Sequence, residues 1–235
     1  MLEFGHTNGS KVDRGFNFIF MLTENDRTIS EWRDVLSALE GTDLRHIGCK
    51  DVGIDASGLA ALATAIHRLG ATSYLELVGA TREDCEIAAD RAIAAGFKCL
   101  LGGVDPLALA ERCRGRIAYY PFPGRVAGHP VALHGSVAEI ARDCRTFDKS
   151  GCPGVDLLLY RSAQAPHAEL LREVRLATSG TLIVAGSINS PDRISELKRA
   201  GVDAFTIGSA IFDGSIFPKA QSTRERVMDV LRVCA

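Results

Sequence analysis

The chain has 235 residues, a formal net charge of −2, 46% hydrophobic residues and 24% charged residues. This balance is typical of a globular protein and speaks against nucleic acid or a membrane surface as a partner, since both attract basic chains. No apolar run approaches the roughly 20 residues of a membrane-spanning helix, and the start of the chain lacks the apolar core of a secretory signal. The seven cysteines follow no metal-binding spacing, so we expect reduced thiols, no metal or other cofactor, and a cytoplasmic protein.

Eight apolar runs alternate with amphipathic stretches along the chain. They predict strands over residues 16–22, 44–49, 73–79, 97–103, 116–122, 155–160, 181–186 and 203–208. In the stretches that follow them, apolar residues recur at the i, i+3, i+4 spacing of helices. Eight strand–helix units in this length predict an α/β fold, the (β/α)8 or TIM barrel, as one domain over 16–235 after a flexible leader over 1–15. An open doubly wound sheet is the alternative, but the Gly-rich dinucleotide turn that usually follows its first strand is missing.

The last two predicted strands both end in Gly-Ser, at Gly186-Ser187 and Gly208-Ser209. In such barrels ligands bind at the carboxyl ends of the strands, and the loops after strands seven and eight often hold a phosphate. Backbone N–H groups that no side chain covers are suited to that task. We therefore predict that these four residues bind phosphate and that SAIFDG continues as a short helix. The alternative is that the glycines only permit tight turns.

Residues 182–214 resemble the phosphate-binding half of the ribulose-phosphate-binding barrel superfamily. They are similar to the C-terminal pattern of the histidine-biosynthesis phosphoribosyl isomerase and of sugar-phosphate epimerases of the N-acetylmannosamine-6-phosphate type. The isomerase resemblance implies an acid after the first and the fifth strand. Here Glu24 and Asp26 lie in the loop after the first, the fifth has none, and the Asp-x-Lys-x-x-Asp motif of the decarboxylase branch is absent. The resemblance thus implies the fold and the phosphate site, and not one reaction.

Three residues are candidates for catalysis: Lys50, Glu76 and His129. Lys50 closes the second predicted strand, where an ammonium group can bind an anion or, if burial lowers its pKa, a neutral amine can form a Schiff base. Glu76 lies within the third strand, and on the inner face of a barrel it would form an acid–base pair with Lys50. His129 follows the fifth strand and can move protons near neutral pH. The alternatives are an exposed strand-end pair, a core ion pair and an ordinary loop residue.

Four more residues are candidates for substrate binding: Asp51, Arg125, Tyr160 and Arg161. Arg125 belongs to a long Gly- and Pro-containing loop after the fifth strand, and Arg161 to the end of the sixth, where each can hold a carboxylate or a second phosphate. A salt bridge at the rim is the alternative for Arg161. No spacing demands a metal ion; Asp51, Glu76 and His129 would be the ligands to suspect.

These observations predict a barrel enzyme whose partner is a small phosphorylated metabolite. The expected reaction is metal-independent isomerisation or epimerisation of a sugar phosphate by acid–base proton transfer. One alternative is an aldolase or lyase in which Lys50 forms a Schiff base with a phosphorylated carbonyl compound. Another is a protein that binds a phosphometabolite without turnover. A homodimer is compatible with the fold, although no residue pattern specifies its surface.

Overall fold

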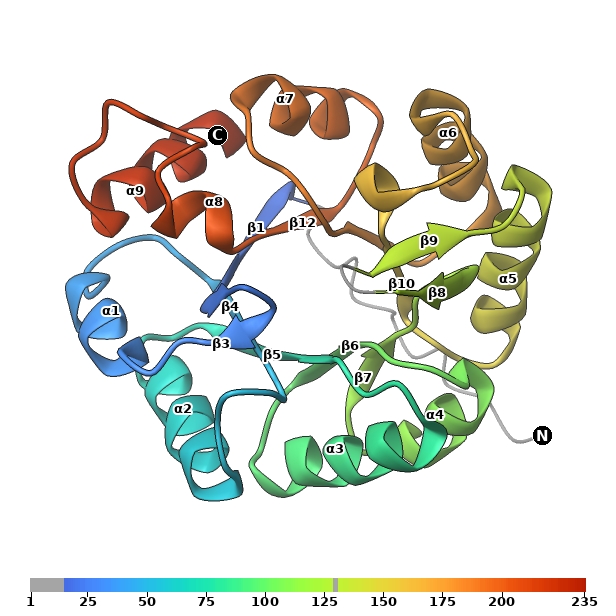
Figure 1. The fold of residues 1–235 in the computed structure, drawn as a ribbon, viewed down its shortest axis with the longest axis horizontal. Coiled ribbons are helices and arrows are strands. Elements are labelled where there is room, and N and C mark those ends of the chain that lie inside the picture. The colour runs from blue at the N-terminus through green and yellow to red at the C-terminus, as the bar shows by residue number, and fades with distance from the viewer. Residues whose placement is uncertain (1–14, 129–130) are drawn as a thin grey trace, which may run out of the picture.

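The computed structural model describes residues 15–128 and 131–235. Eight parallel strands form a barrel inside a ring of helices, as Figure 1 shows along the barrel axis. The strands are β1 (Asn17–Met21), β4 (His46–Lys50), β5 (Thr72–Leu77), β6 (Cys99–Gly102), β7 (Ala118–Tyr120), β10 (Gly154–Leu157), β11 (Thr181–Val184) and β12 (Ala204–Ile207). They neighbour one another in the order β10-β11-β12-β1-β4-β5-β6-β7. The amide of Asp156 donates to the carbonyl of Pro121 at 2.9 Å and draws β10 to the end of β7, so the predicted single-domain barrel is confirmed.

The helices follow the strands as the sequence predicts. They are α1 (Trp32–Ala38), α2 (Ala56–Arg68), α3 (Arg82–Ala94), α4 (Pro106–Cys113), α5 (Val137–Lys149), α6 (His167–Ala177), α7 (Pro191–Arg199), α8 (Ser209–Phe212) and α9 (Thr223–Cys234). Several begin at a residue whose side-chain oxygen accepts a hydrogen bond from an amide of the first turn, as Asp55, Thr81 and Ser190 do. No helix within the described residues is both long and apolar enough to cross a membrane.

The core has an outer and an inner part because side chains alternate along each strand. On β1, Phe18 and Phe20 pack outward against the helices, whereas Ile19 and Met21 point into the barrel. Buried side chains of other strands fill the rest of the interior, namely Tyr74, Cys99, Leu101, Ile183 and Ala204. The interior is therefore a packed core, and space for a ligand is left at the carboxyl ends of the strands.

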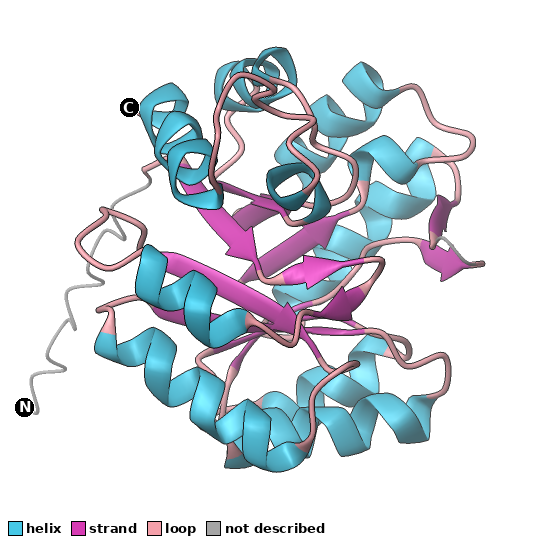
Figure 2. Ribbon diagram, turned by 60° about the vertical axis from the view of Figure 1, so that its left-hand side comes forward, coloured by secondary structure: helices cyan, strands magenta, loops and turns pink. Residues whose placement is uncertain are grey.

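Two short hairpins stand at those carboxyl ends. The first joins β2 (Thr23–Glu24) to β3 (Arg27–Thr28) through Asn25 and Asp26, whose φ angles of 48° and 58° match the central residues of a type I′ turn. The second joins β8 (Arg125–Ala127) to β9 (Ala132–His134) and forms from the segment predicted as an irregular loop. Figure 2 shows this hairpin projecting from the end of the barrel toward which the strands point.

The sixth predicted strand is shorter than expected. It was predicted over 155–160, but β10 ends at Leu157 and the chain turns into the single 3-10 turn η1 (Leu159–Arg161). A turn of about three residues sends successive side chains in different directions. Tyr160 and Arg161 therefore do not extend a strand, and they point to different places.

Candidate functional site

Two cavities meet at the carboxyl ends of the barrel strands. We call the first the polar lobe: it has a volume of about 260 Å³ and is lined by the ends of β11 and β12, including Gly186, Ser187, Gly208 and Ser209. The second, the apolar lobe, has a volume of about 300 Å³ and is lined by the ends of β5 and β6 and by the β8–β9 hairpin. Both lobes are lined by Asp26, Lys50, Glu76, Leu158 and Arg161. The two lobes therefore adjoin one group of charged side chains, formed by Asp26, Lys50, Glu76 and Arg161, which we call the ionic cluster.

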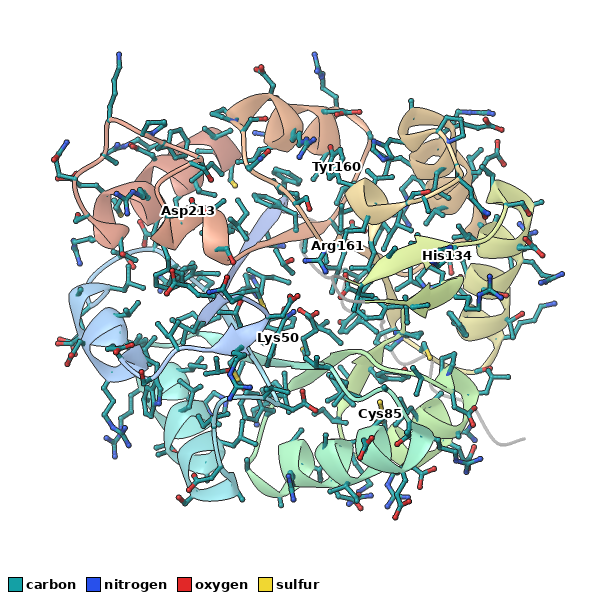
Figure 3. The ribbon with its side chains drawn as sticks, viewed as in Figure 1. Lys50, Cys85, His134, Tyr160, Arg161 and Asp213 are labelled. Atoms are coloured by element: carbon teal, nitrogen blue, oxygen red, sulfur yellow. The ribbon has the colours of Figure 1, made fainter. Side chains whose placement is uncertain are left out.

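Lys50 is the centre of that cluster. Its Nζ lies 2.7 Å from Oδ1 of Asp26 and 3.2 Å from Oε1 of Glu76, and only 9% of its side chain is exposed. Strand register accounts for the second contact, because Lys50 on β4 lies directly opposite Glu76 on β5. Arg161 adds a second cation, with its guanidinium 3.8 Å from Asp26. Figure 3 shows Lys50 and Arg161 near the barrel axis, where the sequence-predicted acid–base pair is thus brought together.

The charge of Lys50 is set by opposing effects. Burial favours the neutral amine and would lower its pKa, but the negative charges of Glu76 and Asp26 outweigh burial and hold the pKa of Lys50 above its ordinary value. The side chain is therefore an ammonium ion at neutral pH. An ammonium group has three N–H donors, and two face the carboxylates. The third can serve a ligand oxygen.

The β2–β3 hairpin also fixes the backbone of Lys50. The buried hydroxyl of Thr28 donates to the carbonyl of Lys50 at 2.7 Å and accepts from its amide at 2.9 Å. One side chain thus satisfies both backbone groups of the residue at the end of β4. Asp26 from the same hairpin binds the side chain. This hairpin is the element that positions Lys50, and it was not predicted from the sequence.

Asp156 is a second group that the sequence reasoning missed. It lies on β10, is completely buried, and neither carboxyl oxygen has a hydrogen-bond partner among the described residues. Burial, reinforced by the nearby negative charge of Glu76 and only opposed by Lys50, holds the pKa of Asp156 well above its ordinary value. Its surroundings inside the barrel therefore favour the neutral carboxylic acid over the carboxylate. The signal was available, because Asp156 stands between apolar residues of a strand as Glu76 does.

The Gly-Ser ends of β11 and β12 line the polar lobe. Among the described residues, the amides of Gly186, Ser187, Gly208 and Ser209 donate to no backbone acceptor. Gly186 has a φ of +86°, and a Cβ there would lie 3.0 Å from the Arg161 side chain. A Cβ at Gly208 would lie 2.5 Å from Oγ1 of Thr23 in the β2–β3 hairpin. Both glycines thus make room for a neighbouring side chain, and both line the polar lobe.

The side chains of Tyr160 and Arg161 point in different directions from the 3-10 turn. Arg161 lines both lobes. The hydroxyl of Tyr160 donates to Glu196 at 3.1 Å, and the guanidinium of Arg193 lies 4.4 Å from its ring centroid. The structure therefore places Arg161 in the site and Tyr160 against α7, lining neither lobe. Figure 3 shows Arg161 nearer the barrel axis than Tyr160.

The remaining predicted residues are not brought to the cluster. Asp51 lines neither lobe, because its carboxylate turns away and accepts a hydrogen bond from the amide of Val78 at 3.0 Å. Arg125 is exposed on β8 and pairs in register with His134. His129 lies outside the described residues. Among those that are described, no group of three His, Cys, Asp or Glu side chains is arranged to hold a metal ion.

Comparisons with known proteins identify the fold. No protein-family model matches the chain, and no curated protein matches it. Among solved structures, it is similar to orotidine 5′-phosphate decarboxylase from Pyrococcus horikoshii OT3, with a TM-score of 0.68 at 13% identity over 92% of this chain and 98% of that one.

Two further structures are similar over most of their length. The YdjI aldolase from Escherichia coli K12 gives a TM-score of 0.66 at 13% identity, over 94% of this chain and 92% of that one. The tryptophan synthase A-subunit from Pyrococcus furiosus gives a TM-score of 0.61 at 14% identity, over 94% of this chain and 96% of that one. Likeness at such identities establishes a fold and no reaction. The chain therefore has the (β/α)8 barrel fold of these structures.

Proposed function

We propose that this chain is an enzyme that isomerises or epimerises a small phosphorylated carbonyl compound, with sugar phosphates as the first class to test. The observation that carries the proposal is the Lys50–Glu76 pair, which adjoins a lobe lined by four uncovered amides. A proton-transfer pair beside an anion site is the arrangement that such a reaction needs. The solved structures of the same fold include a decarboxylase, an aldolase and a synthase subunit, which supports an enzyme.

The phosphate group is assigned to the polar lobe. The amides of Gly186, Ser187, Gly208 and Ser209 donate to its oxygens, and Arg161 supplies positive charge from the cluster. Asp213 also lines this lobe, but one of its carboxylate oxygens accepts the amide of Ser215 at 2.8 Å. Phosphate held at this side leaves the next atoms of the substrate beside Lys50.

The proton transfer is assigned to Glu76. The substrate carbonyl oxygen accepts a hydrogen bond from Lys50, and the free oxygen of the Glu76 carboxylate removes a proton from the adjacent carbon. The C–H electron pair becomes a carbon–carbon double bond while the carbonyl oxygen takes up negative charge, which the Lys50 ammonium stabilises. Where the deprotonated carbon carries a hydroxyl group, return of the proton to the former carbonyl carbon isomerises the substrate, because the hydroxyl proton moves to the oxyanion and a new carbonyl group forms. Return to the opposite face epimerises it and requires a second acid, for which His129 is the candidate from the sequence alone.

The lyase alternative has less support. A Schiff base requires a neutral amine, and the two carboxylates beside Lys50 hold it as an ammonium ion. Borohydride reduction in the presence of phosphorylated aldehydes and ketones tests the point. A covalent adduct on Lys50, detected by peptide mass spectrometry, would favour the lyase.

The decisive experiment follows solvent exchange. The protein is incubated in D₂O with a panel of sugar phosphates, and NMR records the incorporation of deuterium next to the carbonyl group. Glu76→Gln is expected to slow exchange about 10²- to 10⁴-fold and to leave the dissociation constant for inorganic phosphate within a factor of two. Glu111→Gln, on the exposed side of α4, is the matched control and keeps the rate of the unsubstituted protein.

Two results would count against the proposal. Exchange at an unchanged rate in Glu76→Gln would remove Glu76 from the reaction. Binding of phosphorylated compounds without exchange or turnover would favour the non-catalytic binding protein.

A further inference from the structure

The apolar lobe has walls that differ from those of the polar lobe. Sixteen residues line it, five of them shared with the polar lobe, and the other eleven are all hydrophobic residues or glycines. Leu77, Val78, Val104 and Phe122 come from the strand ends, and Val126 and Val131 from the β8–β9 hairpin. Away from the ionic cluster, a sugar chain in this space would lose hydrogen bonds to water, and the described residues of the wall offer no polar side chain in exchange. The lobe is therefore suited to a hydrocarbon group.

The walls of this lobe are closely packed. The ring of Phe122 lies so near Gly102 that a Cβ there would stand 2.2 Å from Cε2 of the ring. A Cβ at Gly103 would stand 2.8 Å from Cδ1 of Leu77. The hydroxyl of Tyr119 donates to the carbonyl of Gly102 at 2.8 Å and fixes this end of β6. The Phe122 ring is thus packed against the backbone at Gly102 and forms part of the apolar wall.

The ionic cluster connects the two lobes. Lys50 and Glu76 line both of them, so a molecule that spans the lobes must place its middle atoms beside the pair. With phosphate at the Gly-Ser ends, the atoms on the far side of the reacting carbon enter the apolar lobe. We infer that the substrate is bipartite, with a phosphate at one end and an aromatic or branched hydrocarbon group at the other. This inference rests on the proposed phosphate site.

The size of the lobe is compatible with a ring. Its volume is about 300 Å³, whereas an apolar cavity of about 150 Å³ suffices for benzene. Removal of a phenyl group from water and its contact with Phe122 are expected to raise affinity about 10- to 100-fold. A polyol of similar length gains nothing of this kind.

Isothermal titration calorimetry with three probes tests the inference: inorganic phosphate, glycerol 3-phosphate and 2-phenylethyl phosphate. The phenyl compound is expected to bind about 10- to 100-fold more tightly than glycerol 3-phosphate. The change in heat capacity on binding is expected to be more negative for the phenyl compound than for glycerol 3-phosphate, because burial of apolar surface makes this change negative. Ser209→Asp, which places a carboxylate among the phosphate-binding amides, is expected to abolish binding of all three probes.

Two variants in the apolar lobe distinguish its contribution to binding from that of the phosphate site. Ala127→Trp fills the lobe from the hairpin and Val104→Asn adds a polar group to its wall. Each is expected to reduce the ratio of the affinities for 2-phenylethyl phosphate and glycerol 3-phosphate at least fivefold. Each should leave the dissociation constant for inorganic phosphate within twofold of its original value. Ala138→Trp and Val137→Asn, which line neither lobe, are the matched controls and keep the full advantage.

The possible failures are distinguishable. Equal affinities for glycerol 3-phosphate and 2-phenylethyl phosphate, with inorganic phosphate still bound, would overturn the inference and leave the phosphate site standing. An advantage of the phenyl compound that survives both lobe variants would place the ring elsewhere and also overturn it. Failure of inorganic phosphate to bind would overturn the phosphate site and, with it, the bipartite substrate.

Discussion

Nζ of Lys50 lies 2.7 Å from Oδ1 of Asp26, a residue that occupies the left-handed turn between β2 and β3. Lys50 thus contacts two carboxylates, and the one that accompanies Glu76 comes from a hairpin and not from a barrel strand. The same hairpin binds the backbone of Lys50 through Thr28. One local element thus sets both the position and the charge of the central cation.

Asp26→Asn tests this relationship through stability. The substitution removes one of the two negative charges beside an almost buried ammonium group, and we expect the free energy of unfolding to fall by about 1 to 3 kcal/mol. Urea denaturation at pH 7 measures the change. Asp43→Asn breaks a salt bridge whose carboxylate is 93% exposed and should cost less than about 0.5 kcal/mol. Equal effects of the two variants would contradict the role of Asp26.

Thr28→Val tests the hold on the Lys50 backbone. Valine keeps the shape of threonine but leaves the buried amide and carbonyl of Lys50 without the hydroxyl, so we expect a loss of about 1 to 3 kcal/mol. Thr146→Val removes an exposed hydroxyl that donates to its own helix at 3.1 Å, and we expect a change below about 0.5 kcal/mol. Thermal unfolding of both variants gives the comparison, and an unaffected Thr28→Val would show that the hairpin does not depend on this contact.

Asp156→Asn tests the neutral acid inside the barrel. Its pKa is raised in the folded state, so between about pH 4 and that raised value the folded chain holds a proton that the unfolded chain has lost. Stability from this group is complete below its unfolded pKa and falls as pH rises, by about 1.4 kcal/mol per pH unit. Asparagine cannot titrate, so the difference between the variant and the unsubstituted protein should shift in favour of the variant from pH 5 to pH 8.

Urea denaturation across that pH range measures the slope. Asp34→Asn, on the exposed face of α1, is the control and should keep the pH dependence of the unsubstituted protein. A slope that Asp156→Asn leaves unchanged would mean that Asp156 is ionised in the folded protein.

Gly186→Ala separates backbone strain from contact with Arg161. Gly70 has a φ of +72° with nothing within 4 Å of a Cβ, so alanine there meets only the backbone penalty of about 1 to 2 kcal/mol. Gly186 has the same kind of φ and also faces Arg161 at 3.0 Å. We expect Gly186→Ala to cost more stability than Gly70→Ala and to weaken binding of inorganic phosphate at least threefold. Equal stability losses with unchanged phosphate binding would contradict the packing of Arg161 on Gly186.

Local patterns were sufficient to predict the barrel and part of its site. Apolar runs and helical periodicity predicted the eight strands, because each strand must bury side chains on both faces and each helix only one. Strand alternation put Glu76 on the face opposite to Leu75 and Leu77, and the structure shows that this face lines the two lobes. The positions of Gly186 and Gly208 after the last two strands were sufficient to place both Gly-Ser pairs at the carboxyl end of the barrel.

The rest depended on contacts between distant segments, which no local pattern encodes. The turn at Asn25 and Asp26 is a local signal, but only the packing of that hairpin on β4 brings Asp26 to Lys50, 24 positions away. The 3-10 turn after Leu157 directs Arg161 to the site and Tyr160 to α7. The sequence by itself determined the barrel, since its strands and helices follow from periodic burial along single elements. Only the tertiary structure decided which charges meet and that an apolar lobe lies beside them, because both depend on how separate loops pack together.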